Sequence, residues 1–247
     1  MLRLFLMSMM VSLAAAAQGK PQKTVVLVHG AFADGSSWEK VIPLLQAKGL
    51  KVVAVQNPLT TLADDVAATK RAIDAQGGPV ILVGHSWAGT VITEAGAHDK
   101  VAALVYVAAF APDEGQSSND LGKDGPPPPG SANIRPDSAG FLSLTPEGVA
   151  RDFAQDLPAA QAAVMAVTQG PIAGKTFDER VTNAAWKTKP SWFIVAEKDR
   201  MIQPDLERAM AKKINARTTA LPTSHVPMLS RPNDVATVIL AAAAAVK

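Results

Sequence analysis

Short runs of consecutive apolar residues recur along the chain and alternate with segments of helical periodicity. The apolar runs occupy residues 24–28, 52–55, 80–83, 101–108 and 191–196, and residues 218–221 form a further short segment of strand character. Runs of this length without polar interruption are typical of strands that are buried on both faces, as in a parallel sheet. The pattern therefore predicts six strands of one sheet.

The intervening segments predict helices. They cover residues 36–48, 62–76, 90–97, 204–213 and 232–246. In the second of them Leu62, Val66 and Ile73 fall on one face. The first opens on Ser36 with Glu39 three residues later, the spacing of a capping box. Strands that alternate with helices form right-handed crossovers, so we predict an α/β fold: a mostly parallel sheet flanked by helices.

The alternation stops after Pro112. Residues 113–140 are rich in Pro, Gly, Ser and Asp, and residues 145–186 look helical. We therefore predict a core over 18–112 and 187–247, interrupted by a cap insertion over 113–186. The four prolines at 126–129 are interpreted as a stiff loop rather than as a segment that binds a partner.

The N-terminus has the pattern of a secretory signal peptide. Arg3 supplies a positive charge, residues 4–13 are mostly apolar, and four alanines follow at 14–17. A membrane anchor is the alternative, but a spanning helix needs roughly 20 apolar residues. We predict a cleaved signal over 1–17, a secreted or periplasmic protein, and no stable membrane insertion.

Composition excludes several classes of function. A formal net charge of +2 over 247 residues gives no reason to expect a nucleic-acid partner. The absence of cysteine excludes disulfides, thiolate metal sites and a cysteine nucleophile. The four histidines are dispersed, and the glycine spacing at 84–89 is unlike a dinucleotide fingerprint, so we expect no metal and no cofactor. We expect a monomer or a homodimer.

The strongest chemical signal is Ser86. A buried run leads into Gly84-His85-Ser86-Trp87-Ala88, and a helix begins at once. Such a tight strand-to-helix turn exposes the hydroxyl above the sheet and requires small residues two positions before and two after it. Gly84 and Ala88 meet that requirement, so we predict that Ser86 is a nucleophile.

A serine hydroxyl needs a general base to attack at neutral pH. His225 lies between the last short strand and the final helix, at the carboxyl edge of the sheet, where Ser86 also lies. His29 and His85 are expected to bond or pack their own loops, and His98 to lie at a helix end. We therefore predict that His225 is the base.

The base needs a carboxylate to orient it. Asp199 follows the strand at 191–196, and the resulting order of serine, aspartate and histidine along the chain is the one this architecture uses. Asp113, after the fourth strand, is a rival, and Glu197 and Asp205 are possible substitutes. We predict that Asp199 is the orienting acid.

An acyl-transfer reaction also needs two preorganised N–H donors for the oxyanion. We predict that they are the backbone amides of Trp87, directly after the nucleophile, and of Ala31, in the loop at 29–32. Gly30 would let that loop pass close to a substrate.

These motifs together resemble the α/β-hydrolase superfamily, and more closely a bacterial branch near the plant methylesterases and hydroxynitrile lyases. The matching pieces lie at 29–32, 84–89, 197–200 and 224–229. The resemblance implies a sheet core under a mostly helical cap, no cofactor, and ester hydrolysis through an acyl-enzyme. Lyases of this kind carry Lys directly after the histidine and Thr after the first-loop histidine. Val226 and Gly30 stand there in this chain, which argues against lyase activity.

We therefore expect a serine hydrolase that cleaves a small to medium carboxylic ester. Amide, lactone or C–C cleavage and cofactor-free perhydrolysis on the same residues stay open, as does a small-molecule binding protein with a vestigial site. The apolar residues expected to contact substrate are Phe32, Phe141, Leu142, Leu144, Met165 and Trp186. The alternative is that these residues only pack the cap onto the core.

Overall fold

A six-stranded parallel sheet forms the centre of the computed structural model, which describes residues 22–246. Its strands are β1 (Thr24–Val28), β2 (Lys51–Val55), β3 (Val80–His85), β4 (Val101–Val107), β8 (Ser191–Ala196) and β9 (Arg217–Leu221). They pair in the order β2-β1-β3-β4-β8-β9, and every pair is parallel. The six predicted strands are confirmed. The predicted signal peptide lies outside the described residues.

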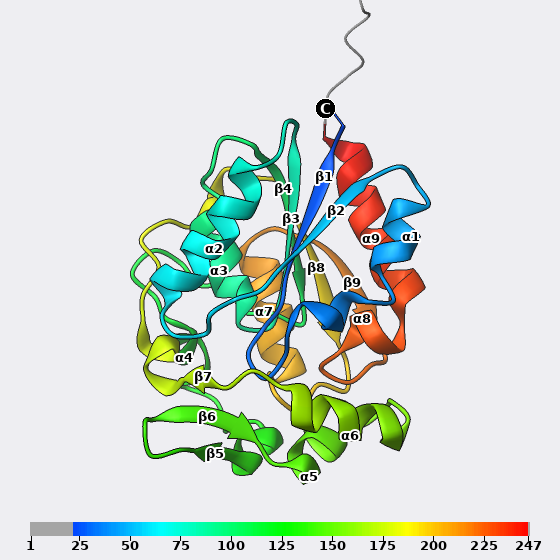
Figure 1. The fold of residues 1–247 in the computed structure, drawn as a ribbon. Coiled ribbons are helices and arrows are strands. Elements are labelled where there is room, and N and C mark those ends of the chain that lie inside the picture. Colours follow the sequence, from blue (N-terminus) through cyan, green and yellow to red (C-terminus); the bar gives the residue numbers. More distant parts are fainter. Residues whose placement is uncertain (1–21, 247) are drawn as a thin grey trace, which may run out of the picture.

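Helices cover both faces of the sheet. They are α1 (Ile42–Gln46), α2 (Leu62–Asp74), α3 (Ala88–Ala95), α7 (Pro204–Lys213), α8 (Pro227–Ser230) and α9 (Pro232–Ala245). In Figure 1, α1 and α9 lie on one side of the sheet, and α2 and α3 on the other. Strands β1, β3 and β8 are buried along their whole length, which explains their unbroken apolar sequences.

The prediction of one continuous helix over residues 36–48 is wrong. The chain forms a 3₁₀ turn, η1 (Gly35–Trp38), and then the short helix α1. Pro43 has no N–H to donate to residue 39, so a continuous helix cannot pass through it. The cap of the first turn is Asp34, whose carboxylate accepts from the Ser36 amide at 2.6 Å, and not the predicted Ser36 capping box.

The segment between β4 and β8 was predicted to be mostly helical, and this prediction is wrong. It contains α4 (Ser118–Gly122), η2 (Pro129–Asn133), β5 (Ile134–Pro136), β6 (Phe141–Leu144), α5 (Pro146–Gly148), the π-helix η3 (Val149–Phe153), α6 (Ala159–Thr168), β7 (Ile172–Ala173), η4 (Gly174–Asp178) and η5 (Ala185–Lys187). Strands β5, β6 and β7 form a second, antiparallel sheet. Figure 1 shows this sheet and α6 beneath the carboxyl ends of the central strands.

A turn made by Asp137 accounts for the unexpected sheet. One carboxylate oxygen of Asp137 accepts from the amides of Ala139 and Phe141, each at 2.8 Å. Gly140 supplies the left-handed backbone (φ 81°) that closes the turn. An aspartate followed three residues later by glycine is a known turn signal, so this hairpin was detectable in the sequence.

Among residues 22–246, no helix has the length and apolar character needed to cross a membrane. The same residues contain no cluster of three or more potential metal-ligating side chains.

Candidate active site

Ser86 occupies the turn between β3 and α3 in a strained conformation. Its φ is 54°, in the left-handed region that L-residues rarely adopt. A Cβ on Gly84 would lie 2.6 Å from the carbonyl oxygen of Ala88, so position 84 does need to be glycine. The turn leaves Ser86 with 7 % of its surface exposed at the carboxyl edge of the sheet.

Two further glycines allow the backbone to close around this turn. A Cβ on Gly89 would lie 2.0 Å from the carbonyl oxygen of Phe110, and a Cβ on Gly30 would lie 2.8 Å from the Cβ of Ser86. Real Cβ atoms do not approach so closely. Gly89 therefore lets α3 pack directly against the chain after β4. Gly30 lets the loop after β1 pack directly against Ser86.

The three predicted triad residues come together. The Nε2 atom of His225 lies 2.8 Å from the Ser86 hydroxyl, and its Nδ1 atom lies 2.5 Å from a carboxylate oxygen of Asp199. All three residues are buried. The imidazole that fits these partners carries its proton on Nδ1, donates it to Asp199, and accepts from the serine hydroxyl at Nε2.

The loop after β8 orients Asp199. Its Oδ1 atom accepts from the amides of Met201 at 2.6 Å and Ile202 at 2.9 Å. These bonds turn the other oxygen, Oδ2, toward His225. A short buried bond of this kind, with one charged partner, is among the stronger hydrogen bonds in proteins.

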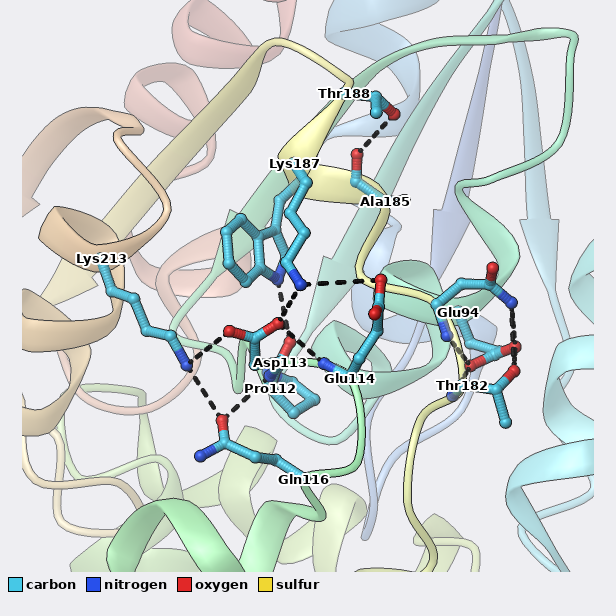
Figure 2. A network of polar contacts seen from close by, with 12 residues as sticks. Glu94, Pro112, Asp113, Glu114, Gln116, Thr182, Ala185, Lys187, Thr188 and Lys213 are labelled. Atoms are coloured by element: carbon cyan, nitrogen blue, oxygen red, sulfur yellow. Dashed lines mark hydrogen bonds and ion pairs between the residues drawn. The ribbon is translucent and has the colours of Figure 1, made fainter.

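Asp113, the rival to Asp199, lies in a different network. Figure 2 shows its carboxylate between the ammonium groups of Lys187 and Lys213, which lie at 2.7 and 3.6 Å. The bond to Lys187 is the main cause that lowers the pKa of Asp113. Glu197 and Asp205, the other two alternatives, both pair with Arg208 at the surface. Of the four carboxylates considered, only Asp199 meets the imidazole.

Two aromatic rings hold the imidazole of His225 in place. The Nε2 atom of His85 donates to the carbonyl oxygen of His225 at 2.7 Å, and the two imidazoles lie 4.8 Å apart. Burial holds the pKa of His85 well below its ordinary value, so this ring is neutral beside the base. Phe153 packs edge-on against His225 at 5.1 Å. The role of Phe153 was not predicted, because its contact with His225 joins residues distant in sequence.

The chain around the π-helix η3 fastens the loops that carry the acid and the base. Asp156 accepts from the Ser224 amide at 2.8 Å, and Gln155 donates to the carbonyl oxygen of Lys198 at 2.7 Å. Asp152 pairs with Arg200 at 2.6 Å. The loops at 198–200 and 224–225 are therefore tied to the same short segment. No sequence signal pointed to these contacts, which depend on how the insertion folds back over the sheet edge.

The two predicted oxyanion donors belong to segments that lie close to Ser86. Trp87 directly precedes α3, and amides at a helix start have no partner within the helix. Ala31 follows Gly30, which touches Ser86. His29 stiffens this loop: its Nε2 accepts from the Asn57 amide and its Nδ1 donates to the Gly30 carbonyl oxygen, both at 2.9 Å. His29 thus bonds its own loop, as the sequence predicted.

A cavity of about 100 Å³ lies between the loop after β1 and α6. Two of the residues expected to contact substrate, Phe32 and Met165, line it, together with Gln169 and Leu229. A hollow of about 280 Å³ around Gly77 and Lys100 lies at the other, amino edge of the sheet, away from the triad.

The other residues expected to contact substrate do not line this cavity. Phe141, Leu142 and Leu144 belong to β6 of the small sheet. Trp186 donates from its indole nitrogen to the carbonyl oxygen of Pro112 at 2.8 Å. Two ammonium groups, of Lys187 and Lys213, lie over its ring at 5.6 and 5.7 Å, in the network of Figure 2. Its setting indicates that Trp186 anchors the end of the insertion.

Comparison with known proteins shows the family to which the chain belongs. A model of the alpha/beta hydrolase family matches residues 25–238. The chain belongs to the alpha/beta hydrolase family. The hydrolase is similar to probable hydrolase R7 of Phoma sp., with 27 % identity over 87 % of this chain and 96 % of that protein. It is also 27 % identical to methylesterase 3 of Arabidopsis thaliana, over 87 % of this chain and 94 % of that protein.

A solved structure shows the same fold. The pyrethroid hydrolase PytH superposes with a TM-score of 0.80 at 25 % identity, covering 91 % of this chain and 98 % of that one. These relatives confirm both the α/β-hydrolase fold and the likeness to plant methylesterases. They also show that the hydrolase spans nearly the full length of its relatives.

Asp65 stabilises the nucleophile turn of the hydrolase through two hydrogen bonds. Its two carboxylate oxygens accept from the indole nitrogen of Trp87 and from the amide of Leu59, both at 2.8 Å. Asp65 is fully buried, and this burial raises the pKa of its carboxyl to about 6. The Leu59 carbonyl oxygen in turn accepts from Ala173 of β7. Asp65 therefore links the nucleophile turn to the insertion.

We expect the ionisation of Asp65 to lower the stability of the hydrolase. Its folded pKa of about 6 exceeds its ordinary value of 3.8, so its stabilising contribution is complete below about pH 4 and is lost as pH rises through 6. The difference corresponds to about 3 kcal/mol. In urea unfolding, the stability of Asp65→Asn relative to the wild type should rise by that amount between pH 3 and 8.

Asp64→Asn is the matched control for this comparison. Asp64 is the preceding residue of α2, is exposed, and accepts from the hydroxyls of Thr60 and Thr61, which lower its pKa. Its effect on stability should have the opposite sign and be lost as pH falls. Parallel pH profiles for Asp65→Asn and the wild type would contradict the expected ionisation.

Proposed function

We propose that the protein is a serine hydrolase that cleaves a small to medium carboxylic ester through an acyl-enzyme. The observation that carries the proposal is the continuous hydrogen-bonded chain from the Ser86 hydroxyl through the imidazole of His225 to Asp199. A strained nucleophile with a base within reach, itself oriented by an acid, is the arrangement of a covalent hydrolase. The methylesterases among its relatives support an ester as the substrate.

In the first half of the reaction, His225 accepts the Ser86 proton at Nε2 while the serine oxygen bonds to the ester carbonyl carbon. The Ala31 and Trp87 amides stabilise the oxyanion that forms. The bond to the alcohol oxygen then breaks, and the imidazolium returns its proton to that oxygen. Asp199 stabilises the imidazolium throughout.

In the second half, water replaces the alcohol. His225 removes one proton from the water as its oxygen attacks the acyl carbon. The bond from the carbon to the serine oxygen breaks, the serine recovers its proton, and the acid leaves. Both halves use the same nucleophile and the same base, which are hydrogen-bonded in the resting site.

The cavity beside Phe32 and Met165 supports a substrate of modest size. Its volume of about 100 Å³ suits a short acyl or alcohol group. Its walls combine four large apolar side chains with a larger number of polar ones, which include Asp34, Glu39 and Gln169. The insertion contributes Met165 and Gln169, so we propose that it selects the substrate.

A substrate panel and an active-site label test the proposal together. The panel consists of p-nitrophenyl esters of increasing acyl length, a lactone and an anilide. We expect the short esters to be hydrolysed fastest, and a fluorophosphonate to label one residue per chain, with Ser86 identified by peptide mass spectrometry. A protein that neither turns over any ester nor reacts with the label would be a binding protein, and the proposal would fail. Faster turnover of the lactone or anilide would assign a different bond to the same triad.

A further inference from the structure

Glu207 is a buried carboxyl group that the proposed reaction does not use. It lies on α7 on the same face as Met210 and Ala211, which are also buried, and its own exposure is 0 %. Its Oε2 atom accepts from the Ala196 amide at 2.9 Å. Strand β8 pairs with its neighbour β4 only as far as Ile194. The Ala196 amide lies beyond that pairing, and Glu207 accepts its hydrogen bond.

The second oxygen of Glu207, Oε1, is buried next to the catalytic acid and has no hydrogen-bond donor among residues 22–246. The carboxyl groups of Glu207 and Asp199 lie within hydrogen-bonding reach of each other. Two carboxylates cannot bond without a proton between them, so one of the two carries it.

The partners of each group decide where that proton lies. Asp199 accepts from two backbone amides at Oδ1 and from His225 at Oδ2, three donors that favour its ionised form. Within residues 22–246, Glu207 has a single donor, the Ala196 amide. The proton therefore belongs on Glu207.

Among the surrounding charges, Arg208 favours ionisation of Glu207, but it is the smallest of the causes that act on the pKa of this carboxyl. The ion pairs of Arg208, its neighbour on α7, go outward to Glu197 and Asp205. Lys213, at the end of the same helix, pairs with Asp113. The charged group that acts most strongly on Glu207 is Asp199, which bonds to His225 on its other side. Burial and the nearby Asp199 raise the pKa of Glu207 well above its ordinary value.

We propose that Glu207 is a neutral carboxylic acid that donates a hydrogen bond to Asp199 and so positions that carboxylate against His225. Glu207 is then a positioning residue, because it acts through Asp199 and touches no reacting atom. Its protonation state can be tested whatever the substrate, whereas its effect on turnover rests on the proposed function.

The protonation state should appear in the pH dependence of stability. Glu207→Gln keeps an acceptor for Ala196 and a donor for Asp199, but it cannot ionise. The unfolded wild type releases the Glu207 proton above about pH 4.5, whereas the folded state retains it. The unfolding constant of the wild type relative to Glu207→Gln should therefore rise about tenfold per pH unit above pH 5, until the folded group ionises.

Asp205→Asn, on the same helix at an almost fully exposed site, is the control and should show no such slope. A ratio for Glu207→Gln that does not change with pH would overturn the proposal. An independent measurement needs no variant: the wild type at pH 8 should show the infrared carbonyl band of a protonated carboxyl, and its absence would have the same meaning.

Turnover tests the positioning role. Glu207→Met preserves the size of the side chain but removes both hydrogen bonds, and kcat should fall about tenfold to a hundredfold with little change in KM. Glu207→Gln should restore most of kcat. If Glu207→Met and Glu207→Gln were both folded and had the same kcat, the positioning role would be overturned. A wild type that hydrolyses no ester would instead reject the proposed function, and the unfolding experiment would still decide where the proton lies.

Discussion

Replacing Ser86 by alanine should reduce kcat for p-nitrophenyl ester hydrolysis by about 10⁴- to 10⁶-fold, the range found when the nucleophile of a catalytic triad is removed. The expected loss is large because the variant retains the base and the acid but has no oxygen to form the acyl-enzyme. The oxyanion donors and the cavity remain, so weak substrate binding should persist. Initial rates under saturating ester measure the effect.

Ser191→Ala is the control for this variant. Ser191 begins β8, has the same exposed fraction of 7 % as Ser86, and bonds only to the carbonyl oxygen of Lys189. Its rate should stay within a few-fold of the wild type. Residual activity of Ser86→Ala above one per cent of wild type, in a protein with an unchanged melting temperature, would show that another group is the nucleophile.

Asp199→Asn should reduce kcat by about 10⁴-fold, through the proton position on His225. The Met201 and Ile202 amides require an acceptor at Oδ1, so the amide nitrogen of the new side chain must replace Oδ2 and face the imidazole. A donor there favours the tautomer protonated at Nε2, which cannot accept the Ser86 proton. The site would keep its shape but lose its base.

Asp113→Asn provides the comparison for the acid. Asp113 also follows a central strand, but its carboxylate bonds to Lys187. We expect its kcat to be close to that of the wild type. If Asp113→Asn lost as much activity as Asp199→Asn, the assignment of the orienting acid would be wrong.

Most of the central fold could be predicted from the sequence, because burial on both faces demands unbroken apolar strands. Residues 24–28 and 191–196 were predicted with the bounds that the structure has. The helix predicted over residues 36–48 was wrong, because the capping pattern at Ser36 was given more weight than the helix-breaking effect of Pro43. The small sheet was missed because its strands are short and half-exposed, and the turn at Asp137 carries most of the signal.

The chemistry that lies at strand ends could also be predicted. Parallel strands bring their carboxyl ends to one edge, so Ser86, Asp199 and His225 were expected to be neighbours although up to 139 residues separate them. The contact residues of the insertion were predicted less well. An apolar residue such as Trp186 can line a cavity or anchor a loop, and its residue type is the same in both cases. Only its neighbours in the structure distinguish the two roles.

The sequence by itself determined which residue types stand at the ends of the strands, because backbone sterics and burial act locally. The tertiary structure decided which of these groups share a proton or a hydrogen bond. Glu207 illustrates the difference: helix periodicity places it on the buried face of α7, but only the packing of α7 under the loop after β8 brings it to Asp199. The protonation of a buried acid depends on every group around it, and those groups come from distant parts of the chain.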